Sequence, residues 1–395
     1  MDPEIQPQPT QNPLTGTQSP SLAPEPLAIT PDAVEYRGLR WIFIGSDGLR
    51  AGWSVLIFLI VAAIITISLG TAASWFAKHV LHIKSTGNFE PVSTMIGEAI
   101  QVLGILVAAA VVARIEQRRV MDYNLTGPRR VFHFVSGLAV GFAALSALVG
   151  GLAWGNWLHF GPAALTGTQI FAFAAQWGVA FLLVGCLEEG TMRCYLQFTL
   201  TRGLNFWIAL GVIGTVCTLL LTIRLVSGKD GGFWGVYAIA LLGLLPCLLL
   251  HLKKSPGAGF WQAAWVTSTL FGAIHTGNNG ENWIGIFAAA AIGFVFCVSV
   301  RLTGSAWWAI GAHAAWDWAE TFFYGTADSG FVPTGHYLTS IPAGNAFWSG
   351  GTDGPEGSIL VIPTIVLILL ILLVLYGRKK LAPTPIPALE LEQAA

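Results

Sequence analysis

Ten runs of about 18–22 mostly apolar residues decide what this sequence can fold into. With 54% hydrophobic and only 10% charged residues, the chain is far more apolar than a soluble core of its length requires. In lipid every backbone polar group must be satisfied internally, so such runs become helices. We predict an all-α, polytopic transmembrane helical bundle over residues 53–377, with spans near 53–73, 95–113, 131–154, 169–200, 204–223, 233–250, 260–277, 282–300, 305–323 and 359–376.

The segments outside the apolar runs are predicted to stay out of the membrane core. Residues 1–35 are rich in Pro, Gln, Ser and Thr and cannot bury enough surface to fold, so they are expected to form a disordered cytoplasmic tail. Residues 36–52 mix Arg with Trp, Phe and Ile, which is typical of an interfacial segment. Residues 378–395 are expected to form a second cytoplasmic tail.

The distribution of Lys and Arg predicts the orientation. With the amino terminus inside, the inner segments hold all basic residues except four, and the reverse orientation would violate the positive-inside rule. The four basic residues left outside are Lys78, Lys84, Arg224 and Lys229. We therefore expect a multi-pass protein of the cell (inner) membrane with both termini cytoplasmic. Membrane lipids are expected partners of the basic clusters, and the net charge of −1 gives no indication of nucleic acid.

Residues 324–358 form a long loop without Lys or Arg, placed outside by this orientation. Its length is compatible equally with a lid over a membrane site and with a merely tolerated connection. The five cysteines lie in or beside apolar runs without a Cys-x-x-Cys pair, so neither a disulfide framework nor a cysteine zinc site is indicated.

Three ionisable residues, Glu188, Glu189 and Arg193, interrupt the fourth apolar run. A charged side chain near the bilayer centre costs about 2.5–3.5 kcal/mol on insertion scales and usually marks a functional site. Glu189 and Arg193 are spaced i, i+4 and are expected to pair along the helix. Glu188 is turned about 100° away and remains available for chemistry.

Two histidines and a further acid lie in later runs. His275 ends the segment Phe271-Gly-Ala-Ile-His275, while His313 and Asp317 share one helical face at i, i+4, with Glu320 close by. Glu188 could act as the general base that takes a proton from water, and His275 could align that water or share a metal that activates it. His313 and Asp317 could stabilise the oxyanion or complete the metal's ligands.

The sequence thus leaves two forms of water activation open. One uses a divalent metal such as zinc on Glu188, His275, His313 and Asp317, and the other uses no metal. The spacing does not match His-Glu-x-x-His, so a metal would have to be held by separate helices.

In their order, these motifs resemble the CPBP intramembrane proteases, a family that includes the endopeptidases trimming prenylated CAAX proteins and the bacterial Abi or bacteriocin-immunity proteins. The family pattern EExxxR, FxxxH and HxxxN/D is similar to Glu188-Glu189-Gly-Thr-Met-Arg193, Phe271-Gly-Ala-Ile-His275 and His313-Ala-Ala-Trp-Asp317.

The resemblance covers about residues 170–325, the expected protease core, which would comprise four catalytic helices. It implies a metalloprotease or glutamate-type protease that cleaves a peptide or protein, with a lipidated substrate left open. It also implies Glu188 and His275 as water activators, His313 and Asp317 as oxyanion or metal partners, and Glu189 with Arg193 as a structural pair.

This chain departs from the family pattern in two respects. Met192 and Cys194 flank the arginine where the family usually has an aromatic residue and a glycine, and two extra runs, 204–223 and 233–250, separate Glu188 from His275. An even number of added spans preserves the orientation of the segments that follow.

Two alternative functions remain open. One is a proton-coupled transporter that uses the same acids and histidines as a relay. The other is an inactive family member that serves as an immunity or scaffold protein. Glu98, near the end of its run, is expected to reach the membrane interface, and the depth of His275 is not fixed by the sequence.

Overall fold

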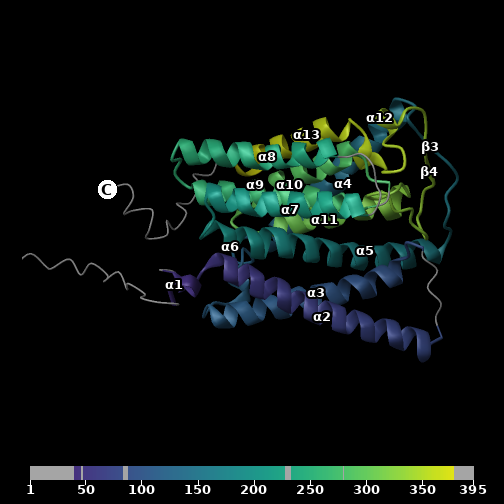
Figure 1. The fold of residues 1–395 in the computed structure, drawn as a ribbon. Coiled ribbons are helices and arrows are strands. Elements are labelled where there is room, and N and C mark those ends of the chain that lie inside the picture. The colour runs from purple at the N-terminus through teal and green to yellow at the C-terminus, as the bar shows by residue number, and fades with distance from the viewer. Residues whose placement is uncertain (1–39, 46–47, 83–87, 227–232, 279, 378–395) are drawn as a thin grey trace, which may run out of the picture.

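The computed structural model describes residues 40–45, 48–82, 88–226, 233–278 and 280–377. The predicted tails 1–35 and 378–395, and residues 36–39 and 46–47 of the predicted interfacial segment, lie outside the described residues. The described part is a helical bundle in which each of the ten predicted spans is a helix (Figure 1). These helices are α2 (Ala51–His79), α3 (Pro91–Ile115), α4 (Arg130–Trp154), α5 with η2 and α6 (Thr168–Glu189, Gly190–Leu196, Gln197–Thr201), α7 (Phe206–Val226), α8 (Phe233–Leu252), α9 (Ala258–His275), α10 (Trp283–Thr303), α11 with η3 (Trp307–Trp318, Ala319–Tyr324) and α13 (Val361–Tyr376).

Short elements lie at the two ends of the bundle. Helix α1 and strands β3 and β4 are at opposite ends in Figure 1. The strands pair antiparallel in β1–β2 and in β3–β4, with His159 opposite Ile341 in the second pair. The short elements are α1 (Arg40–Phe43), β1 (Ile44–Gly45), β2 (Gly48–Leu49), η1 (Val120–Asp122), β3 (Leu158–Phe160), β4 (Ser340–Pro342), α12 (Ala346–Ser349) and η4 (Pro355–Gly357).

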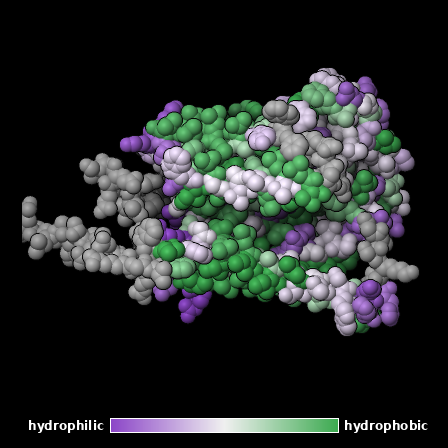
Figure 2. All heavy atoms as spheres, in the orientation of Figure 1, coloured by the Kyte–Doolittle hydropathy of each residue, from purple (hydrophilic) through white to green (hydrophobic). Residues whose placement is uncertain are grey.

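Among the described residues, seven of the ten helices are long and apolar enough to cross a membrane. The other three helices are α9, α11 and α13. Helix α9 has 18 residues but carries polar side chains inside the bundle. Helices α11 and α13 are shorter, with 12 and 16 residues. Apolar side chains cover the middle of the face shown in Figure 2, with hydrophilic residues towards both ends. The chain is a multi-pass membrane protein.

Helices α4 and α11 pack unusually closely because glycines form their interface. Gly137 and Gly141 of α4, spaced i, i+4, lie directly against the backbone of Trp308 and Ala312 in α11. A Cβ on Gly141 would overlap the Ala312 carbonyl group. Small residues at this spacing let membrane helices approach closely. The packing fixes α11 in the bundle immediately beside His313.

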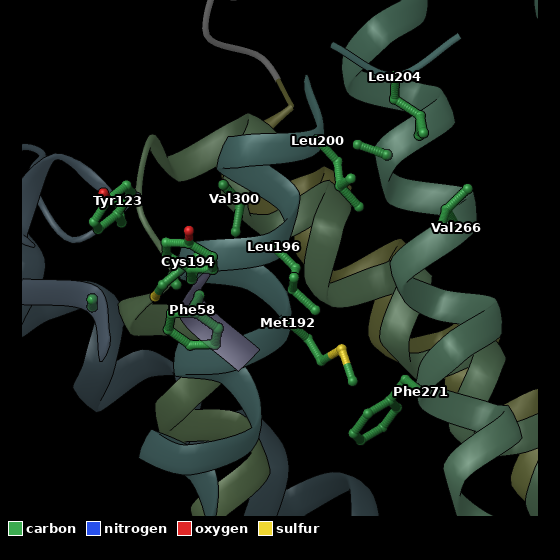
Figure 3. Packing of buried hydrophobic residues seen from close by; sticks show 14 of the residues in the cluster. Phe58, Tyr123, Met192, Cys194, Leu196, Leu200, Leu204, Val266, Phe271 and Val300 are labelled. Carbon is green, nitrogen blue, oxygen red and sulfur yellow. The ribbon is translucent and has the colours of Figure 1, made fainter. Parts of the chain in front are cut away.

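The π-helix η2 lies in a dense apolar cluster. Figure 3 shows Met192, Cys194 and Leu196 of η2 among residues of neighbouring elements, including Phe58 of α2 and Phe271 of α9. Met192 and Cys194, the two departures from the family pattern, are 8% and 3% exposed and form part of this core. A π-helical turn carries one extra residue and is often found at functional sites.

The two extra runs form a helical hairpin that packs on α9. Helices α7 and α8 contact each other, and α8 also packs along α9. Gly243 of α8 lies against the Thr269 side chain of α9, which brings the two backbones close. The added helices therefore extend the bundle beside α9.

Candidate active site

The predicted site residues converge on one cavity of about 240 Å³. Glu188 from α5, His275 from α9, and His313 and Asp317 from α11 all line it. Much of the remaining wall is apolar, contributed by residues of α4, α10 and α13 such as Val140, Ile292, Phe296, Ile365 and Ile368. Acid and imidazole groups from three separate stretches of the chain thus share one enclosed space.

Glu189 and Arg193 lie behind this wall and form a fully buried ion pair. Both side chains are 0% exposed, and Arg193 Nε is 3.2 Å from Glu189 Oε2. The guanidinium also lies over the Phe271 ring, 4.5 Å from its centroid. The predicted pairing is present, although Arg193 belongs to the π-helix instead of a regular α-helical turn.

Glu189 also contacts His313, a role beyond pairing that the sequence did not indicate. His313 Nδ1 is 2.9 Å from Glu189 Oε1. Because the carboxylate only accepts, Nδ1 carries the hydrogen and donates to Glu189. The ion pair therefore fixes the orientation of the imidazole.

The other nitrogen of His313 is directed between two carboxylates. Its Nε2 lies 3.6 Å from Glu188 Oε2 and 3.5 Å from Asp317 Oδ2. The side chain of Glu188 is 29% exposed, compared with 13% for His313 and 9% for Asp317. Glu188 is thus the most accessible acid of this motif group, which suits a group that exchanges protons with water.

His275 is the last residue of α9 and is half-buried. Its Nδ1 lies 2.7 Å from the Phe271 carbonyl oxygen, which can only accept, so Nδ1 carries the hydrogen. In the neutral imidazole with this tautomer, Nε2 is the acceptor. The ring of Phe271 packs edge-on against the imidazole at 4.8 Å between centroids and holds it in place.

Three further carboxylates line the same cavity. Glu98 of α3, expected at the membrane interface, instead faces the cavity and accepts a hydrogen bond from Gln101 (3.1 Å). Asp328 and Glu356 belong to the long loop 325–358, which therefore forms part of the cavity wall. Burial and the neighbouring Glu356 raise the pKa of Asp328 to about 7. The sequence shows the loop acids but does not indicate that they face the cavity.

The four predicted metal ligands differ in spacing from the acid cluster nearby. Among the described residues, one group of three side chains brings its ligand atoms within 4.8 Å of one another. It consists of Glu320, Asp328 and Glu356. Glu188, His275, His313 and Asp317 do not form such a group.

Residues 247–319 match the family described as type II CAAX prenyl endopeptidase Rce1-like. The match confirms the resemblance to CAAX-processing proteases. It includes His275, His313 and Asp317, whereas Glu188 and Arg193 lie before its first residue. It supports an intramembrane endopeptidase with a peptide or protein substrate. No curated protein and no solved structure matches the chain.

Proposed function

We propose that the protein hydrolyses a peptide bond at the membrane with a water molecule activated by Glu188 and His275. The observation that carries this proposal is the cavity shared by Glu188, His275, His313 and Asp317. The Rce1-like match over 247–319 supports an endopeptidase in general. The arrangement of ligand atoms favours the metal-independent form of the mechanism.

Glu188 acts as the general base in this proposal. Its carboxylate takes one proton from water while His275 Nε2 accepts the hydrogen bond of the other, so the water oxygen is directed at the peptide carbonyl carbon. The carbonyl oxygen becomes an oxyanion as the new C–O bond forms. Glu188 then returns the proton to the amide nitrogen as the C–N bond breaks.

His313 supplies stabilisation of the oxyanion. Its Nδ1–H donates to Glu189, so the imidazole is held with Nε2 towards the cavity. A protonated Nε2, beside Asp317 at 3.5 Å, can donate to the developing negative charge. Glu189 and Arg193 act as positioning residues, because Glu189 contacts His313, Arg193 pairs with Glu189, and neither residue lines the cavity.

The apolar walls favour a substrate with apolar or lipidated residues next to the cleaved bond, since burial of such groups from water is favourable. We also propose that the cavity lies nearer the outer side of a cell (inner) membrane. The sequence supports this through the basic residues of the inner segments, and the loop 325–358, which lacks Lys and Arg, covers the cavity.

The test is cleavage of a panel of apolar and lipidated peptides by purified full-length protein. Glu188→Gln should lower kcat/KM by about 10²–10⁴, the usual contribution of a general base. The matched control is Asp122→Asn, which removes an acid that pairs with Arg119 outside the cavity and should leave cleavage unchanged.

The Glu320→Gln variant alters one of the three clustered acids Glu320, Asp328 and Glu356. Chelation with EDTA should leave the cleavage rate of this variant within a few-fold of its initial value if no metal activates the water. Normal cleavage by Glu188→Gln would refute the assignment of the base. If chelation abolishes cleavage in both wild type and Glu320→Gln, and zinc restores it in both, a metal acts in the cavity.

A further inference from the structure

A second group of acids lies beside the catalytic cavity and has no part in the mechanism above. Glu320 of η3, Asp328 of the long loop and Glu356 of η4 each offer a carboxylate oxygen, and these oxygens lie within 4.8 Å of one another. Glu320 is 0% exposed, and neither of its carboxylate oxygens has a hydrogen-bond partner. A buried carboxylate without donors is costly unless something else compensates its charge.

The other two acids are held in place by neutral donors. Thr321 Oγ1 donates to Asp328 Oδ2 (2.7 Å), while Trp316 Nε1 donates to Glu356 Oε1 (2.8 Å) and Ser329 Oγ to Glu356 Oε2 (3.1 Å). These bonds orient the carboxylates and leave lone pairs free.

Within the described part of the chain, no Lys or Arg forms an ion pair with any of the three acids. Residues 324–358 contain no Lys or Arg. The ion pairs found in the described part of the chain involve none of the three acids. Protons or a bound cation must therefore balance the cluster.

We propose that Glu320, Asp328 and Glu356 bind a calcium ion. Carboxylate oxygens are the ligands of hard cations, and calcium accepts six to eight of them in flexible geometry. Ligands at about 2.3–2.6 Å can lie up to about 5 Å apart on opposite sides of the ion, whereas magnesium, at about 2.1 Å, needs a more compact set. The three carboxylate oxygens lie within 4.8 Å of one another, a span that calcium can bridge.

The loop backbone supplies a further oxygen. Gly354 adopts φ +97°, and both the Ala327 carbonyl oxygen and Glu320 Oε1 border the position that a Cβ would occupy there. A side chain at Gly354 would overlap the Ala327 carbonyl group. The missing Cβ therefore keeps room for Ala327 next to the carboxylates, where its oxygen can add to the ligand set.

The proposed ion would join the end of the helix that carries His313 and the start of the long loop to η4. Asp328 and Glu356 also line the catalytic cavity. The calcium thus clamps the loop onto the bundle and shapes the cavity entrance, with no role in activating water. This inference does not depend on protease activity.

The experiment follows calcium and terbium binding to purified full-length protein in detergent after treatment with EDTA. Calcium at about 1 mM, in the range of weak extracellular sites, should raise the apparent Tm by about 2 °C. Terbium should give emission on excitation of tryptophan, because Trp316 contacts Glu356 directly, and calcium should displace it.

The variants Glu320→Gln and Asp328→Asn should abolish the calcium-induced Tm rise. In EDTA, Glu320→Gln should be at least as stable as wild type, since it removes a buried charge; this measurement separates loss of binding from loss of folding. Asp122→Asn, at an exposed acid, and Glu188→Gln, in the catalytic cavity, should keep the full calcium response.

Two results would overturn the proposal. One is an unchanged Tm with calcium in wild type, which would mean that protons balance the cluster. The other is a response that persists in Glu320→Gln but is lost in Glu188→Gln, which would place the ion in the catalytic cavity. Cleavage activity enters neither result, so failure here leaves the proposed hydrolysis untouched.

Discussion

The buried pair of Glu189 and Arg193 makes the most demanding prediction, because stability and activity should respond differently when it is removed. Both side chains are 0% exposed, so Arg193→Met leaves a carboxylate buried without its counter-charge. Removal of one partner of a buried ion pair costs about 3–5 kcal/mol. The lost cation–π contact with Phe271 adds about 0.5–2 kcal/mol. We expect Arg193→Met to lower the free energy of unfolding by at least about 3 kcal/mol.

The double variant Glu189→Gln/Arg193→Met should regain much of this loss, because neither charge then remains unpaired. The coupling energy of the cycle should reach about 2–3 kcal/mol. Cleavage should not recover in parallel. His313 would then donate to a neutral amide instead of a carboxylate. A hydrogen bond weaker by about 1 kcal/mol predicts roughly a fivefold lower kcat.

The assay is unfolding of purified protein in mixed micelles, followed by far-UV circular dichroism, alongside peptide cleavage. The control is Arg119→Met, which breaks an ion pair of 3.0 Å whose Arg119 side chain is 81% exposed. That loss should stay below about 1 kcal/mol. A loss of similar size for Arg193→Met, or a double variant as unstable as the sum of the single variants, would refute the reasoning.

Two further predictions concern packing and pH. Gly141→Ala forces α4 away from Ala312 and should lower the free energy of unfolding by about 1–3 kcal/mol, with reduced cleavage. The control is Gly150→Ala on the same helix, which should be neutral because a Cβ there meets no atom within 4 Å. Equal thermal stability of the two variants would contradict this prediction. Burial and the nearby Asp353 raise the pKa of Glu281 to about 9. Since this pKa exceeds the unfolded value, the associated stability is present at low pH and lost as pH rises towards 9. In EDTA, the apparent Tm of wild type should fall more steeply than that of Glu281→Gln as pH rises towards 9. The same dependence of Tm on pH in both proteins would argue against the raised pKa of Glu281.

The helices could be predicted well from the sequence because the requirement that produces them is local. Any run that crosses lipid must satisfy its own backbone, so hydropathy alone located all ten. The pairing of Glu189 with Arg193 was likewise predictable from i, i+4 spacing. Local spacing could not reveal the π-helix that carries Arg193, because an extra residue in a turn depends on packing against neighbouring helices.

Contacts between segments distant in sequence could not be predicted. Glu98 seemed interfacial because its distance from the end of its own run was the only available guide, yet α3 packs beside α5 and directs it into the cavity. The acids of the long loop could be seen, but their meeting with Glu320 required the loop to fold back onto the end of α11. The hydrophobic periodicity of a sequence does not predict where a loop folds back onto a helix.

The uncertain depth of His275 has the same origin. The sequence placed it near the end of a helix and Glu188 towards the middle of another, so that a kinked, tilted or deeper helix at 260–277 would bring the two level. In the structure α9 does end at His275, and the cavity extends to that level because the loop 325–358 closes it there. The loop therefore does more than connect two helices: it provides the wall that allows a residue at a helix end to share an enclosed space with Glu188. Loosening of the loop should consequently impair catalysis even though it supplies neither the base nor the oxyanion donor.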